Sequence, residues 1–193
     1  MPDNNELYFC PTCRQDWRDW LEQHHESHQS VWLVFYKISS GVPSVTWSDA
    51  VDEALCFGWI DSTKKTMDEN RYKQFFSKRK AKSNWSRINK EKIEMLTSQG
   101  LMTKAGFESV EVAKQNGSWT ILDEVEALII PTDLDEALNN QEGAKSYFLR
   151  LSKSKRKSLL YWVMSAKRTE TRQNRISEVV LHSAQQQLPK QFR

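Results

Sequence analysis

Two cysteines and two histidines near the start of the chain have a spacing that resembles a zinc site. Cys10 and Cys13 form a C-x-x-C pair, and His24 and His28 follow, with ten residues between Cys13 and His24. Tetrahedral zinc sites with two cysteines and two histidines have a similar pattern. However, residues 13–25 carry apolar side chains at helical spacing, and such a helix would hold Cys13 and His24 roughly 16 Å apart. Because zinc–ligand bonds are only about 2 Å long, we expect no metal site.

The same cysteine pair has a second chemical interpretation. Cys13 would lie near the N-terminus of the predicted helix, where thiolates are stabilised, so Cys10 and Cys13 could form a redox pair. We favour two reduced cysteines, one of which packs against neighbouring residues. The third cysteine, Cys56, lies beside Phe57 on the apolar face of a later predicted helix and is expected in the core.

Motifs of several common enzyme classes are absent from the sequence. It contains no G-x-S-x-G nucleophile elbow, no G-x-x-x-x-G-K phosphate loop and no H-E-x-x-H metal motif. Three of the four histidines lie between residues 24 and 28, so any assignment of a Ser-His-Asp or Cys-His site would be arbitrary. We therefore expect a binding protein with no catalytic residues and no cofactor. An enzyme with Asp61 as a general base is an alternative that we favour less.

The clearest candidate site lies within residues 54–89. Residues 59–65 and 71–77 are predicted to form a β-hairpin, and Trp59 and Asp61 share one face of its first strand because side chains alternate along a strand. A carboxylate, a guanidinium and two indoles near one strand end have the composition of a pocket for a small ligand or a peptide. The expected ligand-binding residues are Trp59, Asp61, Arg79, Ser83 and Trp85.

Within this site we expect Asp61 and Arg79 to lie within hydrogen-bonding distance, with Trp59 or Trp85 beside them. Among the basic residues 78–80, Arg79 is the best partner, because its planar guanidinium suits a bidentate carboxylate contact and also stacks on indole rings. The alternative is a structural Asp–Arg pair, with the two indoles filling the core.

Charge is distributed unevenly along the 193 residues. Residues 1–70 carry twelve acidic and five basic residues, a net charge of −7, whereas residues 71–193 have a net charge of +10. Most of the positive charge lies in residues 71–92 and 145–175. Basic helices in these two runs, with tryptophans that stack on bases, would suit nucleic-acid binding. We favour the interpretation that they form solvated faces, so nucleic acid is the less favoured partner.

Alternating strand and helix patterns characterise the first part of the chain, and helical patterns the rest. We expect helices with N-caps at Thr12 and Ser48, a strand buried on both faces at residues 31–38, and the hairpin described above. The helices expected after residue 84 begin near Ser86 or Asn89, Thr103, Thr132, Gly143, Ser154 and Thr169.

These patterns predict an α+β fold. An N-terminal mixed β-sheet with helices, residues 1–83, is followed by an all-helical C-terminal half, residues 84–193, packed against it. No stretch approaches the roughly 18 apolar residues of a membrane-spanning helix. Residues 1–10 also lack the basic start and apolar segment of a signal peptide. We therefore expect a cytoplasmic protein with no membrane span.

Several of these segments resemble the YdeI/OmpD-associated family, also known as bacteriocin-protection proteins. The resemblance rests on Ala54–Asp61 (ALCFGWID), on the block R-K-x-x-S-x-W-S at residues 79–86, and on the A-K-R-x-E-T-R segment at residues 166–172. It covers roughly residues 15–185. The chain departs from the family at Ser77-Lys78, where members usually have Thr-Pro, and the cysteine pair is not part of the family pattern.

The resemblance implies an association with bacteriocin or cationic-peptide tolerance and with an outer-membrane porin. It implies no reaction, cofactor or catalytic residue. The expected partners are therefore a small ligand or a peptide and, through the resemblance alone, a porin or another envelope protein.

Overall fold

The computed structural model describes residues 6–193, which form two compact units. The first unit ends at Thr120 and the second comprises Ile121–Arg193. The expectation for residues 1–10 falls partly outside the described residues. The domain division expected between residues 83 and 84, and the packing expected between the two halves, stay predictions.

The helices and strands of the first unit are β1 (Tyr8–Phe9), α1 (Arg14–His24), β2 (Ser30–Tyr36), the 3-10 turn η1 (Ile38–Ser40), α2 (Trp47–Cys56), β3 (Trp59–Thr66), β4 (Arg71–Lys78), α3 (Arg87–Ser98) and α4 (Lys104–Gln115).

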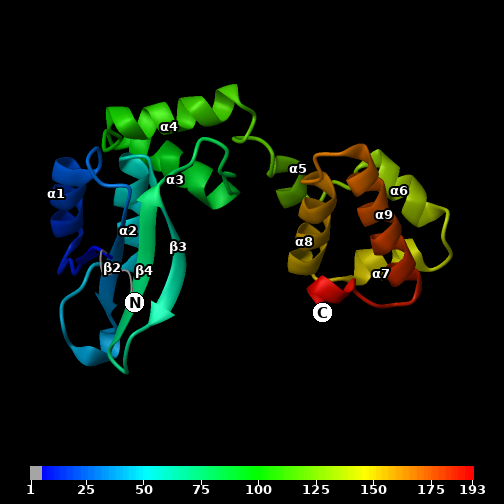
Figure 1. Ribbon diagram of the computed structural model, residues 1–193, viewed down its shortest axis with the longest axis horizontal. Helices are drawn as coiled ribbons and strands as arrows, with labels where there is room; N and C mark the ends of the chain where they lie inside the picture. Colours follow the sequence, from blue (N-terminus) through cyan, green and yellow to red (C-terminus); the bar gives the residue numbers. More distant parts are fainter. Residues whose placement is uncertain (1–5) are drawn as a thin grey trace. The chain divides into compact units, whose positions relative to one another are not determined.

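A mixed four-stranded sheet forms the first unit, as predicted (Figure 1). Its strand order is β1-β2-β4-β3; β1 is parallel to β2, and β4 is antiparallel to both β2 and β3. Side chains of β2 alternate between the two faces of the sheet. Leu33 and Phe35 belong to the main core, whereas Trp32 is buried on the other face, where the Lys73 ammonium lies 4.4 Å from its ring centre. The strand is thus buried on both faces, as expected.

Aromatic side chains join the helices to one face of this sheet. Trp17 of α1 stacks on Trp20 with 5.1 Å between ring centres and meets Phe76 of β4 edge-on at 5.5 Å. Trp59 contacts both indoles edge-on. Such aromatic pairs contribute about 0.5–1.5 kcal/mol beyond the burial of their area. The apolar periodicity of residues 13–25 therefore predicts the buried side of α1 correctly.

Two arginines and a buried glutamate connect α1 to α2. Glu53 is only 1% exposed, and its carboxylate accepts hydrogen bonds from Arg14 Nε at 2.5 Å and Arg18 Nη1 at 2.7 Å. Arg18 Nη2 also donates to the Leu101 carbonyl at 3.3 Å, between α3 and α4. The N-cap of α2 is Thr46, two residues earlier than the expected Ser48. Glu53 therefore lies beyond the first turn, on the side of α2 that faces α1.

Two glycines allow α4 to lie against the end of α2. A Cβ atom on Gly106 would lie 2.3 Å from the Cys56 carbonyl oxygen, a distance that backbone atoms cannot accommodate. Gly58 has φ +70°, a conformation that favours glycine, and a Cβ there would lie 2.9 Å from the Ala105 carbonyl. Thr103, the predicted N-cap of α4, also donates its hydroxyl to the Cys56 carbonyl at 2.7 Å. The first helices of the predicted helical half thus pack on the sheet unit.

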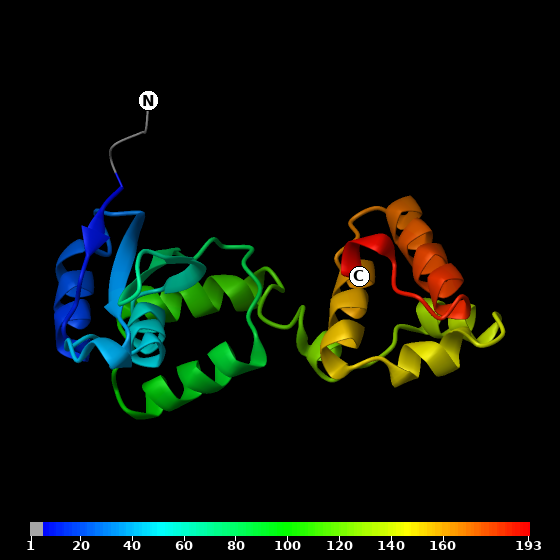
Figure 2. The same cartoon turned by 90° about the horizontal axis from the view of Figure 1, so that it is seen from below.

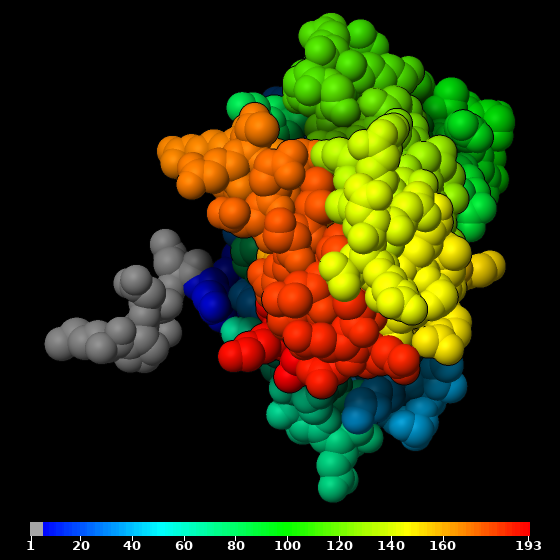
Figure 3. Space-filling view, turned by 90° about the vertical axis from the view of Figure 1, so that its right-hand side faces the viewer, coloured from blue at the N-terminus to red at the C-terminus, as the bar shows by residue number. Residues whose placement is uncertain are grey.

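The second unit is helical. It contains α5 (Asp123–Glu126), α6 (Thr132–Asn139), α7 (Ala144–Arg150), α8 (Lys153–Met164), α9 (Thr169–Ala184) and the 3-10 turn η2 (Lys190–Phe192). Leu138, Phe148, Leu160 and Val179 are among its fully buried residues. Figure 3 shows a face of this unit, on which α9 (orange to red) borders α6 and α7 (yellow-green to yellow). A helical C-terminal half is thus confirmed.

We expect Glu53→Gln to destabilise the protein by about 3 kcal/mol or more, because two arginines lose the carboxylate that neutralises them in a buried position. Urea unfolding measures this change. Glu22→Gln is the matched control, since Glu22 also binds Arg18 but is exposed, and it should cost less than about 1 kcal/mol. Equal effects of the two substitutions would contradict a central role for Glu53.

Candidate functional site

The five residues expected to bind a ligand lie in different environments. Trp59 is fully buried in the aromatic core beside Trp17 and Trp20. Ser83 lies in the turn after β4, where its N–H donates to the Lys80 carbonyl at 2.9 Å. The other three residues, Asp61, Arg79 and Trp85, carry the polar contacts described below. Ligand binding by the five as one site stays a prediction.

Asp61 is half-buried and holds two side chains in place. Its Oδ2 atom accepts hydrogen bonds from the indole N–H of Trp47 at 3.0 Å and from the Gln74 amide at 2.8 Å. Gln74 is buried and also donates to the Ser62 carbonyl at 3.0 Å. A β-bulge follows Asp61, between Asp61 and Lys64. The carboxylate therefore fixes the orientation of Trp47, the first residue of α2.

Arg79 stacks on Trp85, as its chemistry suggested, but it does not bind Asp61. Its guanidinium carbon lies 3.6 Å from the Trp85 ring centre, and Nη1 donates to the Asn84 carbonyl at 2.9 Å. Nε and Nη2 are buried and have no hydrogen-bond partner among residues 6–193. Burial lowers the pKa of Arg79 to about 10, and the charge of Asp61 acts in the opposite direction.

The prediction of a hydrogen bond between Asp61 and Arg79 is therefore wrong, and the strand register explains why. Asp61 is paired with Phe76, whereas Arg79 follows the end of β4 and donates its backbone N–H to Gly58. Three residues along a strand span roughly 10 Å. Asp61 and Arg79 consequently contact different residues: Asp61 binds the Trp47 indole, and Arg79 stacks on Trp85.

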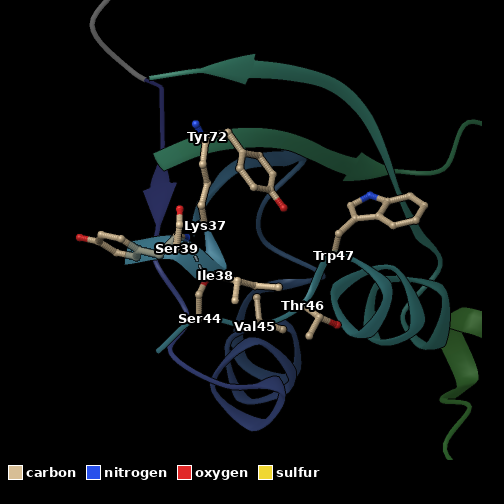
Figure 4. A pocket seen from close by; sticks show the side chains of 9 residues that line it. Lys37, Ile38, Ser39, Ser44, Val45, Thr46, Trp47 and Tyr72 are labelled. Atoms are coloured by element: carbon tan, nitrogen blue, oxygen red, sulfur yellow. Dashed lines mark hydrogen bonds between the residues drawn. The ribbon is translucent and has the colours of Figure 1, made fainter. Parts of the chain in front are cut away.

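An aromatic pocket lies next to the Trp47–Asp61 pair (Figure 4). It has a volume of about 490 Å³, within the range of roughly 300–1,000 Å³ typical of small-molecule sites. Figure 4 shows Trp47 and Tyr72 facing the same space, with Ile38 and Val45 below them. The lining residues are Tyr36, Lys37, Ile38, Ser39, Ser44, Val45, Thr46, Trp47 and Tyr72.

Contacts with neighbouring residues hold the side chains and the loop that line this pocket. Tyr72 stacks on Phe35 of the core with 5.0 Å between ring centres, and the Lys64 ammonium lies 3.9 Å from the Tyr72 ring centre. Burial raises the pKa of Tyr72, so its phenol stays neutral at physiological pH. Ser44 Oγ accepts a hydrogen bond from the Tyr36 N–H at 3.1 Å, which fixes the loop before α2. The pocket is thus preformed rather than assembled from mobile side chains.

Three apolar residues of the pocket segment are exposed to solvent. The exposed fractions are 101% for Ile38, 46% for Val42 and 49% for Trp47. Ile38 and Trp47 both line the pocket, so two exposed apolar side chains border it. Trp47 was not among the expected site residues. Its position as the first residue of α2 gives no sequence signal that its N–H would bind Asp61, fourteen residues later.

A smaller pocket, of about 260 Å³, borders Arg79 and Lys78. Its other walls include His25, Glu26 and Glu108. Its lining contains both acidic and basic side chains. The Nε and Nη2 atoms of Arg79 are buried, so they are not exposed to this pocket. The pocket at Trp47 is therefore the better candidate for ligand binding.

The two basic runs are largely engaged in contacts within the protein. The nucleic-acid interpretation assumed a basic helix over the run 71–92, and this is wrong, because residues 71–78 form β4, as the hairpin prediction required, and α3 begins only at Arg87. Ion pairs of the two runs join Arg71 to Asp68, Lys73 to Glu6, Lys92 to Asp52, Lys145 to Asp135, Lys157 to Glu126 and Arg172 to Asp133. Lys155 and Arg175 bind backbone carbonyls. These contacts reduce the charge that would be available to a nucleic acid.

The cysteines have different environments. Cys10 and Cys13 are both exposed free thiols, so the expectation that one of them packs against its neighbours is wrong, whereas Cys56 is a free thiol buried in the core, as predicted. The helix α1 lies between Cys13 and His24, as the sequence predicted. Within residues 6–193 no group of three or more Cys, His, Asp or Glu residues has the arrangement of a metal site.

Two family models match the chain. The model described as a domain of unknown function (DUF8412) matches residues 9–109, just over half of the chain. The model described as Bacteriocin-protection, YdeI or OmpD-Associated matches residues 127–186, which confirms the resemblance for this segment. The blocks at residues 54–61 and 79–86 lie within the first match. No curated protein and no solved structure matches the chain.

We expect Asp61→Ala to cost about 1–2 kcal/mol of stability, because the buried amide of Gln74 loses an acceptor, and to release the Trp47 indole. The N–H signal of Trp47 in ¹H–¹⁵N spectra should move towards that of a solvated indole. Asp61→Asn retains an acceptor and should show smaller changes in both measurements. An unchanged Trp47 signal in Asp61→Ala would contradict the positioning role of the carboxylate.

We expect two of the three thiols to react in the folded, reduced protein. Burial, followed by the charge of Glu53, raises the pKa of Cys56 to about 11, so roughly a thousandth of it is thiolate at pH 8. Alkylation with iodoacetamide, mapped by mass spectrometry, should modify Cys10 and Cys13, and all three cysteines only after unfolding. Rapid modification of Cys56 in the folded protein would be inconsistent with its buried position.

Proposed function

We propose that this chain, which belongs to the family described as a domain of unknown function (DUF8412), is a cytoplasmic, non-catalytic binding protein. The observation that supports this proposal is the preformed pocket whose half-exposed wall, Trp47, is held in place by Asp61. The pocket lining has aromatic and hydroxyl side chains and one lysine. Among the described residues, no helix is long and apolar enough to cross a membrane.

The ligand that fits best is a peptide with apolar side chains and positive charge. Aromatic walls bind apolar side chains by burial and ring contacts. Apart from Tyr72, the lining lies within residues 1–70, whose net charge of −7 attracts a cationic partner at long range, while Lys37 in the lining and Lys64 on Tyr72 are the nearby positive charges. The family that matches residues 127–186 is described by bacteriocin protection. Tolerance of cationic peptides is therefore the biological role that we propose, and association with a porin is a second role suggested only by that description.

Binding of a synthetic peptide with alternating Lys and Phe tests this function. We expect Trp47→Leu to weaken binding about tenfold or more, which corresponds to about 1.4 kcal/mol, because the peptide loses one aromatic wall. Phe107→Leu is the matched control, since Phe107 of α4 is 48% exposed but lies outside the pocket. Isothermal titration calorimetry measures both affinities.

A peptide with Ala in place of Phe separates the pocket from non-specific attraction. It carries the same charge, so equal binding of the two peptides would contradict the proposal, as would full affinity in Trp47→Leu. A single-stranded oligonucleotide provides the comparison with the alternative function. Its binding would have to fall by orders of magnitude between 50 and 200 mM salt if the basic runs bound phosphate.

A further inference from the structure

The C-x-x-C pair lies at the junction of β1 and α1. Cys10 directly follows β1, and Cys13 precedes the first residue of α1 with an extended backbone, φ −147°. Both thiols are exposed. A pair of exposed cysteines separated by two residues, at the start of a helix, is an arrangement in which a disulfide forms within one chain.

Two features of the surroundings bear on the oxidation of the pair. The Cys13 thiol donates to Asp16 Oδ1 at 3.4 Å, and Thr12 donates its N–H and hydroxyl to Asp16 Oδ2 at 2.9 and 2.5 Å, which holds this carboxylate beside Cys13. The hydroxyl of Thr12 above all holds the pKa of Asp16 below its usual value. Cys10 is exposed overall, but desolvation by its neighbours raises the pKa of its thiol. Since stabilised thiolates favour the reduced form of such pairs, the raised pKa of Cys10 favours the disulfide.

The cysteine loop is attached to the aromatic pocket. The Pro11 carbonyl, between the two cysteines, accepts a hydrogen bond from the Val45 N–H at 3.2 Å. Val45 is buried and lines the pocket. Thr46, the next residue, is the N-cap of α2 and accepts from the Asp49 N–H at 3.1 Å, so a shift of Val45 would be passed directly to Trp47.

We propose that Cys10 and Cys13 form a reversible disulfide that changes the position of the pocket wall formed by Val45, Thr46 and Trp47. The pair is thus a modification site, and its reaction partner is a small-molecule disulfide or a protein with an exposed disulfide. In a reducing compartment such a bond forms transiently and reports oxidising conditions.

The reaction is thiol–disulfide exchange. The Cys13 thiolate attacks one sulfur of the oxidant, the S–S bond of the oxidant breaks, and the first thiolate leaves. The Cys10 thiolate then attacks Sγ of Cys13 in the mixed disulfide, which forms the Cys10–Cys13 bond and releases the second thiolate. The two protons lost by the cysteines end on the two released thiols. The protein is oxidised by two electrons and the small-molecule disulfide is reduced by two.

Glutathione disulfide is the probe for the first test. After incubation with an excess of it, the intact protein should lose the mass of two hydrogen atoms and remain monomeric, and glutathione in the reduced form should reverse the change. Cys10→Ser and Cys13→Ser should each instead retain one glutathione on the remaining cysteine. A stable glutathione adduct on the unmodified chain, or a disulfide-linked dimer, would overturn the proposal.

The Trp47 indole N–H signal tests the connection to the pocket without any ligand. On oxidation it should shift in the unmodified chain and remain unchanged in Cys10→Ser, and the signal of Trp162 in α8 should stay constant in both. If the disulfide forms but the Trp47 signal does not move, the proposed effect on the pocket is wrong. Because neither measurement uses a bound peptide, both outcomes are independent of the proposed function.

Discussion

A carboxylate buried between two arginines determines the position of α2 in the first unit. Glu53 binds Arg14 and Arg18 of α1, and Arg18 extends the contact to the Leu101 carbonyl before α4. An unpaired charge in this position would be strongly destabilising, so the three side chains specify one way of packing α1 on α2. Trp47 lies at the start of α2 and Cys56 at its end. The location of the pocket wall and the packing of α4 therefore both depend on the same ion pairs.

The register of the sheet places Asp61 and Arg79 at different positions along the hairpin. In β3 and β4, Asp61 lies opposite Phe76 and Trp59 lies opposite Lys78. Asp61 is therefore held two residues inside the open end of the hairpin, where the Gln74 amide reaches it, while Arg79 follows the end of β4 and stacks on Trp85. A cation stacked on an indole is stabilised even where it lacks a carboxylate partner. Arg79 therefore packs the end of β4 against the segment before α3, through Trp85 and the Asn84 carbonyl.

Local patterns in the sequence predict the elements well, because they depend on neighbouring residues. The helical spacing of Trp17, Trp20 and Leu21, and the apolar run of β2, identify the core face and the buried strand. The partner of Arg79 could not be predicted, since the expected contact with Asp61 depended on how far β4 continues before the chain turns. Glu53 also could not be recognised, because a glutamate near a helix N-terminus is normally solvated and its arginine partners lie 35 and 39 residues away. Long-range pairings of this kind have no local signal.

Charge and aromatic contacts contribute differently to binding at the pocket. In the proposed function, the acidic first part of the chain would attract a cationic peptide over a distance of about a Debye length, roughly 8 Å at physiological salt, and would thereby affect mainly the rate of association. The walls formed by Trp47 and Tyr72 would act only on contact, so they would determine how long the proposed peptide stays bound. Many basic side chains of the second part are paired with carboxylates or carbonyls within the protein. The specificity of the proposed site would therefore depend on the orientation of the aromatic walls, where Asp61 binds the Trp47 indole and the Pro11 carbonyl binds the Val45 N–H.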